Sequence, residues 1–216
     1  MILIYGKNKN LCRSAREIFL GMGYISEVAD GGAMPETRHR GIVILGRDDA
    51  VFGREFVQKI RTGAAKIPII AVREDLLRVA DGVDAVFPCS LSVGHTVQEM
   101  GRIADARGCP RIGEYAAGEL SAAVGKPIML CGEAVEMTKA EGLILRTLLA
   151  VHPVGLSAEG IAALAFRAGR EPSASGVRTH IAAINRRLRA VAGENILLSD
   201  SGRYSIKLRT REEITV

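Results

Sequence analysis

Arginine is the residue type whose placement points most directly to a chemistry. The segment from Arg167 to Arg189 carries six arginines and one glutamate, a local charge of +5, and the net charge of the whole chain is also +5. Basic charge is thus concentrated in one segment rather than spread along the chain. Guanidinium groups gathered in this way can neutralise the phosphates of a nucleic acid. The alternative interpretation is a basic helix face that is only solvated.

The cysteines and histidines are too dispersed to predict a metal site or a catalytic centre. Successive cysteines lie 77, 20 and 22 residues apart, whereas zinc sites and dithiol redox centres use closely spaced pairs. No Ser/His/Asp or Cys/His motif indicates nucleophilic catalysis. We therefore expect reduced structural thiols, no metal, no cofactor and no enzymatic activity. The cysteines are Cys12, Cys89, Cys109 and Cys131.

The composition is that of an ordinary globular protein. The chain has 216 residues, of which 48% are hydrophobic and 25% charged, which suits one large or two modest domains and excludes a disordered, collagen-like or disulfide-scaffold protein. No apolar run reaches the roughly 18 to 20 residues that cross a bilayer. The sequence begins MILIYGKNKN, with its charges after the apolar stretch, the reverse of a secretory signal. These features predict a cytoplasmic protein without membrane contact.

The first half of the chain alternates short apolar runs with segments of helical spacing. This pattern predicts an α/β domain over residues 1–107, with a doubly wound, five-stranded parallel sheet of the flavodoxin-like kind. The expected strands are 2–5, 24–28, 41–45, 67–72 and 85–87, and the expected helices are 10–20, 31–38, 54–61, 74–80 and 93–106. Ligands of such folds bind at the carboxyl ends of the strands. This edge lacks the glycine-rich pattern of a phosphate loop.

The order and spacing of ILIY, GIVIL, IPIIAV and GVDAVF resemble those of a bacterial response-regulator receiver. The resemblance implies five functional positions: two acids that bind Mg²⁺, an Asp that accepts the phosphoryl group, a Ser or Thr, and a Lys. Those positions hold Gly6, Lys7, Gly46, Arg73 and Cys89 here. Because Mg²⁺ requires carboxylate oxygens, aspartyl phosphorylation should fail. Asp48 and Asp49, just beyond the acceptor position, are the alternative acceptors.

Apolar periodicity is lost between Ala104 and Glu114, where the sequence ADARGCPRIGE gathers Gly, Pro and Arg. This change predicts an exposed linker over residues 108–114 and a second domain over residues 115–216. Short β-like pieces open the second domain, and the T-x-x-E pattern at 138–141 predicts a capped helix start. A second helix at 157–166, a third helix that includes 177–191 and a terminal hairpin at 195–208 are expected to follow.

The third helix of this domain carries a single apolar stripe. Val177, Ile181, Ile184, Leu188 and Val191 recur at intervals of four, three, four and three residues. A small sheet, three helices of which the last is basic, and a hairpin together resemble the winged-helix effector domain of OmpR/PhoB-type response regulators. The stretches VRTHIAAINRRL and GRY match that family's third helix and wing. The resemblance implies a DNA-binding domain.

A helix of this kind fills the major groove, with the residues opposite its apolar stripe facing the base edges. We expect Arg178, Thr179 and Ala182 to lie near bases and the later arginines to lie mainly on phosphates. The side chain of Arg203, at the tip of the hairpin, is expected to enter the adjacent minor groove. The predicted DNA-contacting residues are Arg178, Thr179, Ala182, Asn185, Arg186, Arg187, Arg189 and Arg203.

These features together predict a bacterial, sequence-specific transcription regulator that acts as a homodimer without aspartyl phosphorylation. The resemblance implies that residues 74–80, 84–87 and 93–106 form the dimer contact, that double-stranded DNA is bound at repeated half-sites, and that the loop 167–172 contacts RNA polymerase. Two alternatives remain open. One is a regulator that binds a small acidic molecule in the altered receiver pocket. The other is a protein-interaction adaptor that does not bind DNA.

Overall fold

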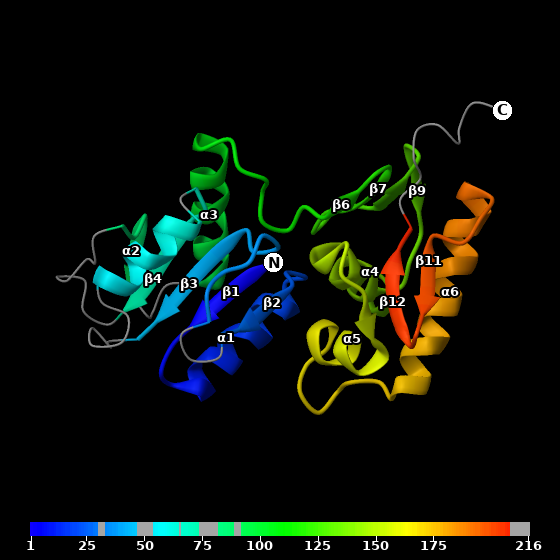
Figure 1. Cartoon of the computed structure of the whole chain (residues 1–216), viewed down its shortest axis with the longest axis horizontal. Coiled ribbons are helices and arrows are strands. Elements are labelled where there is room, and N and C mark those ends of the chain that lie inside the picture. The colour runs from blue at the N-terminus through cyan, green and yellow to red at the C-terminus, as the bar shows by residue number, and fades with distance from the viewer. Residues whose placement is uncertain (30–32, 47–53, 65, 74–81, 89–91, 208–216) are drawn as a thin grey trace. The chain divides into compact units, whose positions relative to one another are not determined.

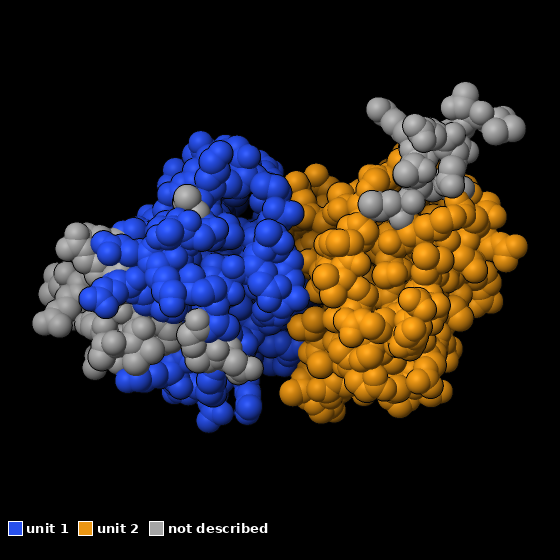
Figure 2. Space-filling view, in the orientation of Figure 1, with its two compact units in different colours: residues 1–112 blue, residues 113–216 orange. Residues whose placement is uncertain are grey.

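The computed structural model describes residues 1–29, 33–46, 54–64, 66–73, 82–88 and 92–207. The chain divides into two compact units, Met1–Ile112 and Gly113–Val216, which Figure 2 shows in different colours. Within the described ranges, no helix has both the length and the apolar character needed to span a membrane. Each unit is described below by itself.

Unit 1 is built on a five-stranded parallel sheet (Figure 1). The strands are β1 (Ile2–Tyr5), β2 (Ser26–Val28), β3 (Gly41–Leu45), β4 (Ile69–Arg73) and β5 (Ala85–Pro88). They are arranged in the order β2-β1-β3-β4-β5, and each neighbouring pair is parallel. This is the strand order of the flavodoxin-like fold. The predicted fold class of the first half is therefore confirmed.

Helices cover both faces of this sheet because successive residues of each strand point to opposite sides. On one face, Ile2 and Ile4 of β1 join a core with α1 (Lys9–Gly21) and α3 (Val93–Ala106). On the other face, Leu3 and Tyr5 join a second core with α2 (Arg54–Gly63). Strands that are buried on both faces need the nearly continuous apolar runs seen in the sequence.

The helix expected over 31–38 is wrong for the described residues 33–40, which form turns and irregular chain. His39 is buried there, and its Nδ1 accepts a hydrogen bond of 2.7 Å from the Glu36 backbone N–H. Its Nε2 therefore donates to the Glu27 carboxylate, 2.8 Å away on β2. These bonds fix the segment against the edge of the sheet instead of letting it coil. The helix expected over 74–80 lies outside the described residues.

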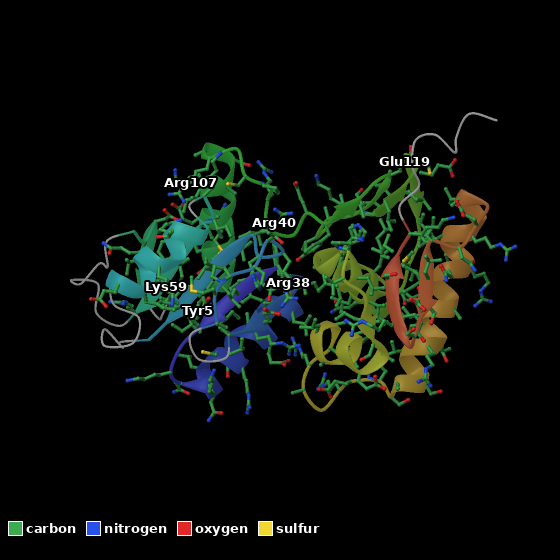
Figure 3. The ribbon with its side chains drawn as sticks, viewed as in Figure 1. Tyr5, Arg38, Arg40, Lys59, Arg107 and Glu119 are labelled. Atoms are coloured by element: carbon green, nitrogen blue, oxygen red, sulfur yellow. The ribbon has the colours of Figure 1, made fainter. Side chains whose placement is uncertain are left out.

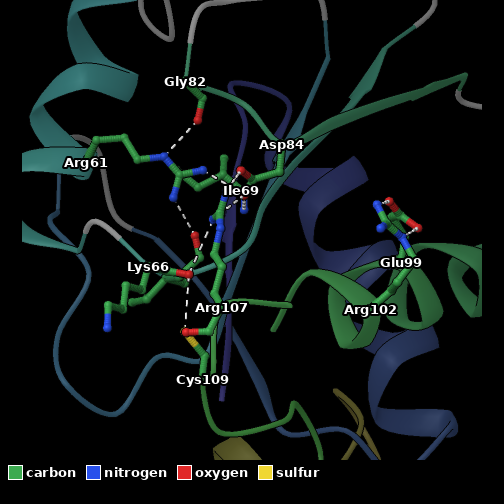
Figure 4. A network of polar contacts seen from close by, with 10 residues as sticks. Arg61, Lys66, Ile69, Gly82, Asp84, Glu99, Arg102, Arg107 and Cys109 are labelled. Carbon is green, nitrogen blue, oxygen red and sulfur yellow. Dashed lines mark hydrogen bonds and ion pairs between the residues drawn. The ribbon is translucent and has the colours of Figure 1, made fainter. Parts of the chain in front are cut away.

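A buried carboxylate joins three parts of unit 1 (Figure 4). Asp84 accepts hydrogen bonds of 2.7 Å from Arg61 of α2, 2.7 Å from the backbone N–H of Ile69 and 3.1 Å from Arg107, which makes a second contact with its other oxygen. Arg61 also donates to the carbonyl oxygens of Gly82 and Ile67. The network ties α2, the start of β4 and the end of α3 together.

The chain after α3 packs onto unit 1 as far as Ile112. The side chain of Ile112 is buried in the core beside Met100, and a Cβ placed on Gly41 would lie 2.5 Å from it. The Cys109 sulfur lies 3.4 Å from the Lys66 carbonyl oxygen and is only partly exposed. Cys109 and Ile112 of the expected linker therefore pack on unit 1, whereas Gly108, Pro110, Arg111 and Glu114 are exposed.

Unit 2 has the winged-helix arrangement of strands and helices that the sequence predicts. A four-stranded antiparallel sheet comes first, followed by three helices and a second small sheet in the order β10-β12-β11. The short β10 pairs with β12 and was not expected from the sequence. The elements in chain order are β6 (Ala116–Ala117), β7 (Leu120–Ala122), β8 (Ile128–Leu130), β9 (Glu133–Val135), α4 (Lys139–Val151), β10 (Leu156–Ser157), α5 (Ala158–Ala165), α6 (Ala174–Ala192), β11 (Leu197–Asp200) and β12 (Arg203–Ile206).

Replacing Asp84 is expected to destabilise unit 1. In Asp84→Asn, two guanidinium groups lose their counter-charge in a site where the carboxylate is 8% exposed. We expect a loss of about 2 to 4 kcal/mol, somewhat below that for a fully buried pair because Arg107 is 34% exposed. Urea unfolding followed by circular dichroism measures the change.

Asp105→Asn is the matched control, because Asp105 pairs with Arg111 at the surface, where both side chains are about half exposed. Solvent screens such a pair, so the urea midpoint should stay close to that of the unsubstituted chain. Equal shifts for the two variants would contradict a structural role for the Asp84 network.

Candidate nucleic-acid interface

The basic third helix of unit 2, α6, is defined by caps at both ends. The Ser173 hydroxyl accepts a 3.1 Å hydrogen bond from the Gly176 N–H, which satisfies a backbone donor at the helix start. Gly193 ends the helix in the left-handed conformation with φ of 77°, which glycine adopts without strain. These signals explain why the helix occupies Ala174–Ala192 and neither extends nor frays into the flanking loops.

One face of α6 is buried in the three-helix core. The predicted stripe of Val177, Ile181, Ile184 and Leu188 is buried, and Ala192 completes it in place of the half-buried Val191. These side chains pack against α4 and α5. The burial fixes the rotation of α6 about its axis, so its opposite side must face outward.

We call that opposite side the outer face of α6. All of its side chains are exposed, and the helix contains no acidic residue along its length. Positive charge on this face is therefore not neutralised by carboxylates of the same helix. The outer face consists of Arg178, Thr179, Ala182, Arg186 and Arg189.

The Thr179 hydroxyl is engaged within the helix. It donates a 3.1 Å hydrogen bond to the carbonyl oxygen of Ser175, one turn earlier. Because the hydroxyl proton is used in this way, Thr179 has no hydrogen-bond donor left to offer on the outer face, and its side chain also carries a methyl group there.

Arg187 lies on the flank of α6 and is tied to α4. Its Nε is 3.4 Å from a Glu141 carboxylate oxygen, and its Nη1 donates a 3.3 Å hydrogen bond to the Glu136 carbonyl oxygen. Glu141 is the capping-box residue of α4, and it accepts a 2.7 Å bond from the Thr138 N–H. The guanidinium group of Arg187 thus holds α6 against the start of α4, while its side chain stays 42% exposed.

Burial and hydrogen bonding act in opposite directions on Glu141. Burial alone raises the pKa of this carboxyl group, but the hydrogen bonds from Thr138 and the positive charge of Arg187 outweigh it and hold the pKa below its usual value. The charged form of Glu141 is thus favoured in the folded protein.

Asn185 has a structural partner as well. Its side-chain amide donates to the Leu197 carbonyl oxygen and its side-chain oxygen accepts from the Leu197 N–H, both at 2.8 Å. This pair of bonds fixes the first residue of β11 to α6. Both ends of the Asn185 amide are thus engaged by the hairpin.

The hairpin of β11 and β12 turns at Ser201 and Gly202, whose φ values of 49° and 75° are those of a tight turn with two left-handed residues. Arg203 is the first residue of β12, and its guanidinium group contacts the Gly155 carbonyl oxygen beside β10. Arg203 thus directly follows the turn and is exposed, and in this structure its side chain reaches back toward β10.

Arg178 lies near the start of α5. Hydrogen bonds from the backbone N–H of Glu159 itself and from the Ser157 hydroxyl, together with the charge of Arg178, hold the pKa of Glu159 below its usual value. Arg178 remains exposed, so this nearby carboxylate leaves its guanidinium group accessible.

In unit 1, two of the expected receiver positions at the carboxyl ends of the strands disfavour a side chain, Gly6 for lack of room and Gly46 for its backbone conformation. A Cβ placed on Gly6 would lie 2.6 Å from the Cys12 sulfur and 3.0 Å from the Leu45 carbonyl oxygen. Gly46 has a φ of +102°, a conformation that an aspartate rarely adopts. Lys7 is exposed and Arg73 is 4% exposed, while Cys89, Asp48 and Asp49 lie outside the described residues.

The last residue of β1, directly before Gly6, has an aromatic side chain. Tyr5, labelled in Figure 3, donates a 2.6 Å hydrogen bond to the Ala33 carbonyl oxygen and packs edge-on against Phe56. Burial and the charge of Glu27 raise the pKa of its phenol to about 12. Among the described residues, no cluster of three or more His, Cys, Asp or Glu side chains could hold a metal ion.

Comparison with known proteins gave no matching family model and no match among curated proteins. Among solved structures, the chain is similar to the response regulator DrrB, an OmpR/PhoB homologue from Thermotoga maritima, at 16% identity over 95% of this chain and 98% of that chain, with a TM-score of 0.42. It is also similar to a protein of a streptococcal family of redox sensors that evolved from two-component response regulators, at 16% identity over 96% and 99% of the two chains, with a TM-score of 0.40. The T. maritima response regulator TrrA, in complex with Mg²⁺ and BeF, matches 47% of this chain and 96% of its own at 15% identity and a TM-score of 0.40. These identities and TM-scores are low, so the function must be inferred from this chain's own residues.

Adding a side chain at Gly6 is expected to destabilise unit 1. The added methyl of Gly6→Ala would overlap the Cys12 sulfur and press on the Leu45 backbone oxygen, which cannot move aside. Such overpacking costs about 1 to 3 kcal/mol, and the melting temperature should fall accordingly. Gly63→Ala is the control, because a Cβ there meets no atom within 4 Å. Equal melting temperatures for the two variants would show that Gly6 is not a close-packed position.

The capping carboxylate of α4 predicts a pH dependence. The pKa of Glu141 is lower in the folded chain than its usual value, so the stabilisation by its charge is present above the usual pKa and is lost as the pH falls through the folded pKa. Glutamine keeps the capping geometry but carries no charge. The difference in unfolding free energy between the unsubstituted chain and Glu141→Gln should therefore be constant from about pH 7 to pH 5 and shrink toward about pH 3. Urea titrations across this range measure it, and a constant difference throughout would contradict the assignment.

Proposed function

We propose that this chain is a sequence-specific, double-stranded-DNA-binding transcription regulator of the OmpR/PhoB type. It acts as a homodimer and does not depend on aspartyl phosphorylation. In this proposal, unit 2 reads DNA through α6, and unit 1 supplies the contact between two copies. Such a regulator acts in the bacterial cytoplasm, where its promoters are.

The outer face of α6 is the observation that carries this proposal. It presents three arginines on a helix without acids, and the buried stripe on the other side holds that helix in a fixed rotation. A helix fits the major groove, which is about 12 Å wide, and its outward side chains then reach the base edges and the flanking phosphates. A merely solvated face would need neither the fixed rotation nor the hairpin that Asn185 attaches to the same helix.

The proposal gives each expected residue a role. We assign Arg178, Thr179 and Ala182 to the bases, and Arg186 and Arg189 to the phosphates. Residues that are engaged within unit 2 take a different role: they position the helix and the hairpin. These residues are Asn185, Arg187 and Arg203.

The strand ends of unit 1 support independence from phosphorylation. Mg²⁺ takes carboxylate oxygens, and phosphoryl transfer needs that metal to neutralise the developing charge. The position of the first acid is Gly6, where a side chain would meet the Leu45 backbone, and the position of the acceptor is Gly46 in a left-handed conformation. An altered receiver of this kind is suited to holding two copies together rather than to sensing phosphate.

Dimerisation is assigned to β5, α3 and residues 74–80 of unit 1, the last of which lie outside the described residues. A dimer presents two outer faces to half-sites about one helical turn of DNA apart, roughly 34 to 36 Å. We assign the loop 167–172, between α5 and α6, to contact with RNA polymerase.

The test is selection of bound duplexes from random-sequence DNA by the whole chain, at about 150 mM salt and without a phosphodonor. A repeated motif is the expected result. Recovery of no motif would overturn the proposal and favour a protein-interaction adaptor.

Two variants then separate the assigned roles on the selected motif. Arg178→Ala should relax the preference at one base position by about 1 to 3 kcal/mol. Arg186→Ala should weaken binding to all sequences alike and reduce the slope of log affinity against log salt by about 0.9. Arg111→Ala, at an exposed pair in unit 1, is the control and should leave binding unchanged. Uniform losses from both α6 variants would contradict the division between base and phosphate contacts.

A further inference from the structure

The middle of the outer face of α6 is apolar in character, although arginines surround it. The Thr179 hydroxyl proton is given to the Ser175 carbonyl oxygen at 3.1 Å, and Ala182 has only a methyl group to offer. Both residues are exposed. The side chains that reach outward at this point are therefore two methyl groups rather than hydrogen-bond donors.

These two methyl groups are neighbours on the helix. Residues three apart lie side by side on a helix surface, with Cβ atoms about 5 to 6 Å apart. Arg178 precedes them and Arg186 follows them on the same face. An arginine on either side can anchor the helix to guanine or phosphate, and the surface between them offers two methyl groups and, as a hydrogen-bond acceptor only, the Thr179 hydroxyl oxygen.

Among the four bases, only thymine presents a methyl group in the major groove. We propose that the methyl groups of Thr179 and Ala182 select thymine by apolar contact with its C5 methyl group. This inference rests on the proposed function, since it assumes that the outer face of α6 enters the major groove. It adds the identity of the base that this part of the face selects, and it makes Thr179 a specificity-determining residue through its methyl group.

The size of the effect follows from burial of a methyl group. Removing one buried methyl from an apolar contact weakens an interaction about threefold to fivefold. A duplex in which one thymine of the motif is replaced by deoxyuridine lacks only that C5 methyl and keeps every hydrogen-bonding group. The inference predicts such a loss at one or two positions of each half-site and no loss at the remaining thymines.

The experiment uses the whole chain and the duplex obtained by selection, with deoxyuridine placed at one thymine position at a time. Binding is measured by fluorescence anisotropy for the unsubstituted chain and for two variants. Thr179→Ser keeps the hydroxyl group and loses the methyl group, whereas Thr179→Val loses the hydroxyl group and keeps the methyl. At one thymine, the preference over deoxyuridine should disappear in Thr179→Ser and persist in Thr179→Val.

Ala182→Gly tests the second methyl group in the same way. The comparison of thymine with deoxyuridine is made within each variant, so a uniform loss of affinity caused by the substitution cancels. Circular dichroism melting of each variant shows that α6 is retained. Preference for thymine at a second position should disappear in Ala182→Gly alone.

Three outcomes overturn the inference. They are tight binding that is indifferent to deoxyuridine at every position, survival in Thr179→Ser of the thymine preference at every position where the unsubstituted chain shows one, and loss in Thr179→Val of the preference that Thr179→Ser also removes, which would assign the reading to the hydroxyl oxygen. Each of these leaves the proposed function intact because a motif is still bound. Recovery of no motif by the whole chain overturns the proposed function, and this inference with it.

Discussion

Burial of the apolar stripe of α6 is the constraint on which the candidate interface depends. The stripe packs against α4 and α5, so the helix cannot rotate without exposing Val177, Ile184 and Leu188 to water. Two polar contacts then fix the positions of the hairpin and of α4 relative to α6. Asn185 sets the hairpin beside the helix, and Arg187 sets the helix beside the start of α4. The outer face is the surface that remains after these requirements are met.

The fold of unit 1 does not depend on which residues follow its strands. The five-stranded sheet and its two cores need only apolar side chains that alternate between faces. They place no demand on the residues that follow the strands. Gly6 allows the chain to pass close to Cys12 and the Leu45 backbone, so packing occupies the space that a carboxylate would need.

The fold was accessible to sequence reasoning because it follows from periodicity and caps, which are local. The stripe of α6 and the Thr138–Glu141 capping box were both predicted from residues a few positions apart. The partners of Asn185, Arg187 and Arg203 were not predicted, because Leu197, Glu141 and Gly155 lie 12, 46 and 48 positions away and become neighbours only after packing. The failed helix at 31–38 has the same origin, since the His39 bonds to Glu27 depend on strand pairing. The sequence thus shows which residues of a helix are charged, but it does not show which of these side chains are already bound to other parts of the fold.

The availability of charge also explains why association between copies matters to the proposal. Each phosphate contact adds to affinity for any DNA sequence and to its salt dependence. With Arg187 and Arg203 engaged within unit 2, the outer face keeps three arginines, Arg178, Arg186 and Arg189, and one copy makes correspondingly few such contacts. Binding to arbitrary sequences is then weak, and contacts with base edges make up a larger share of the total. Joining two copies makes the second binding event intramolecular and restores affinity without adding non-specific charge. In the proposed function, a helix with three outward arginines and a first unit that joins two copies therefore complement each other.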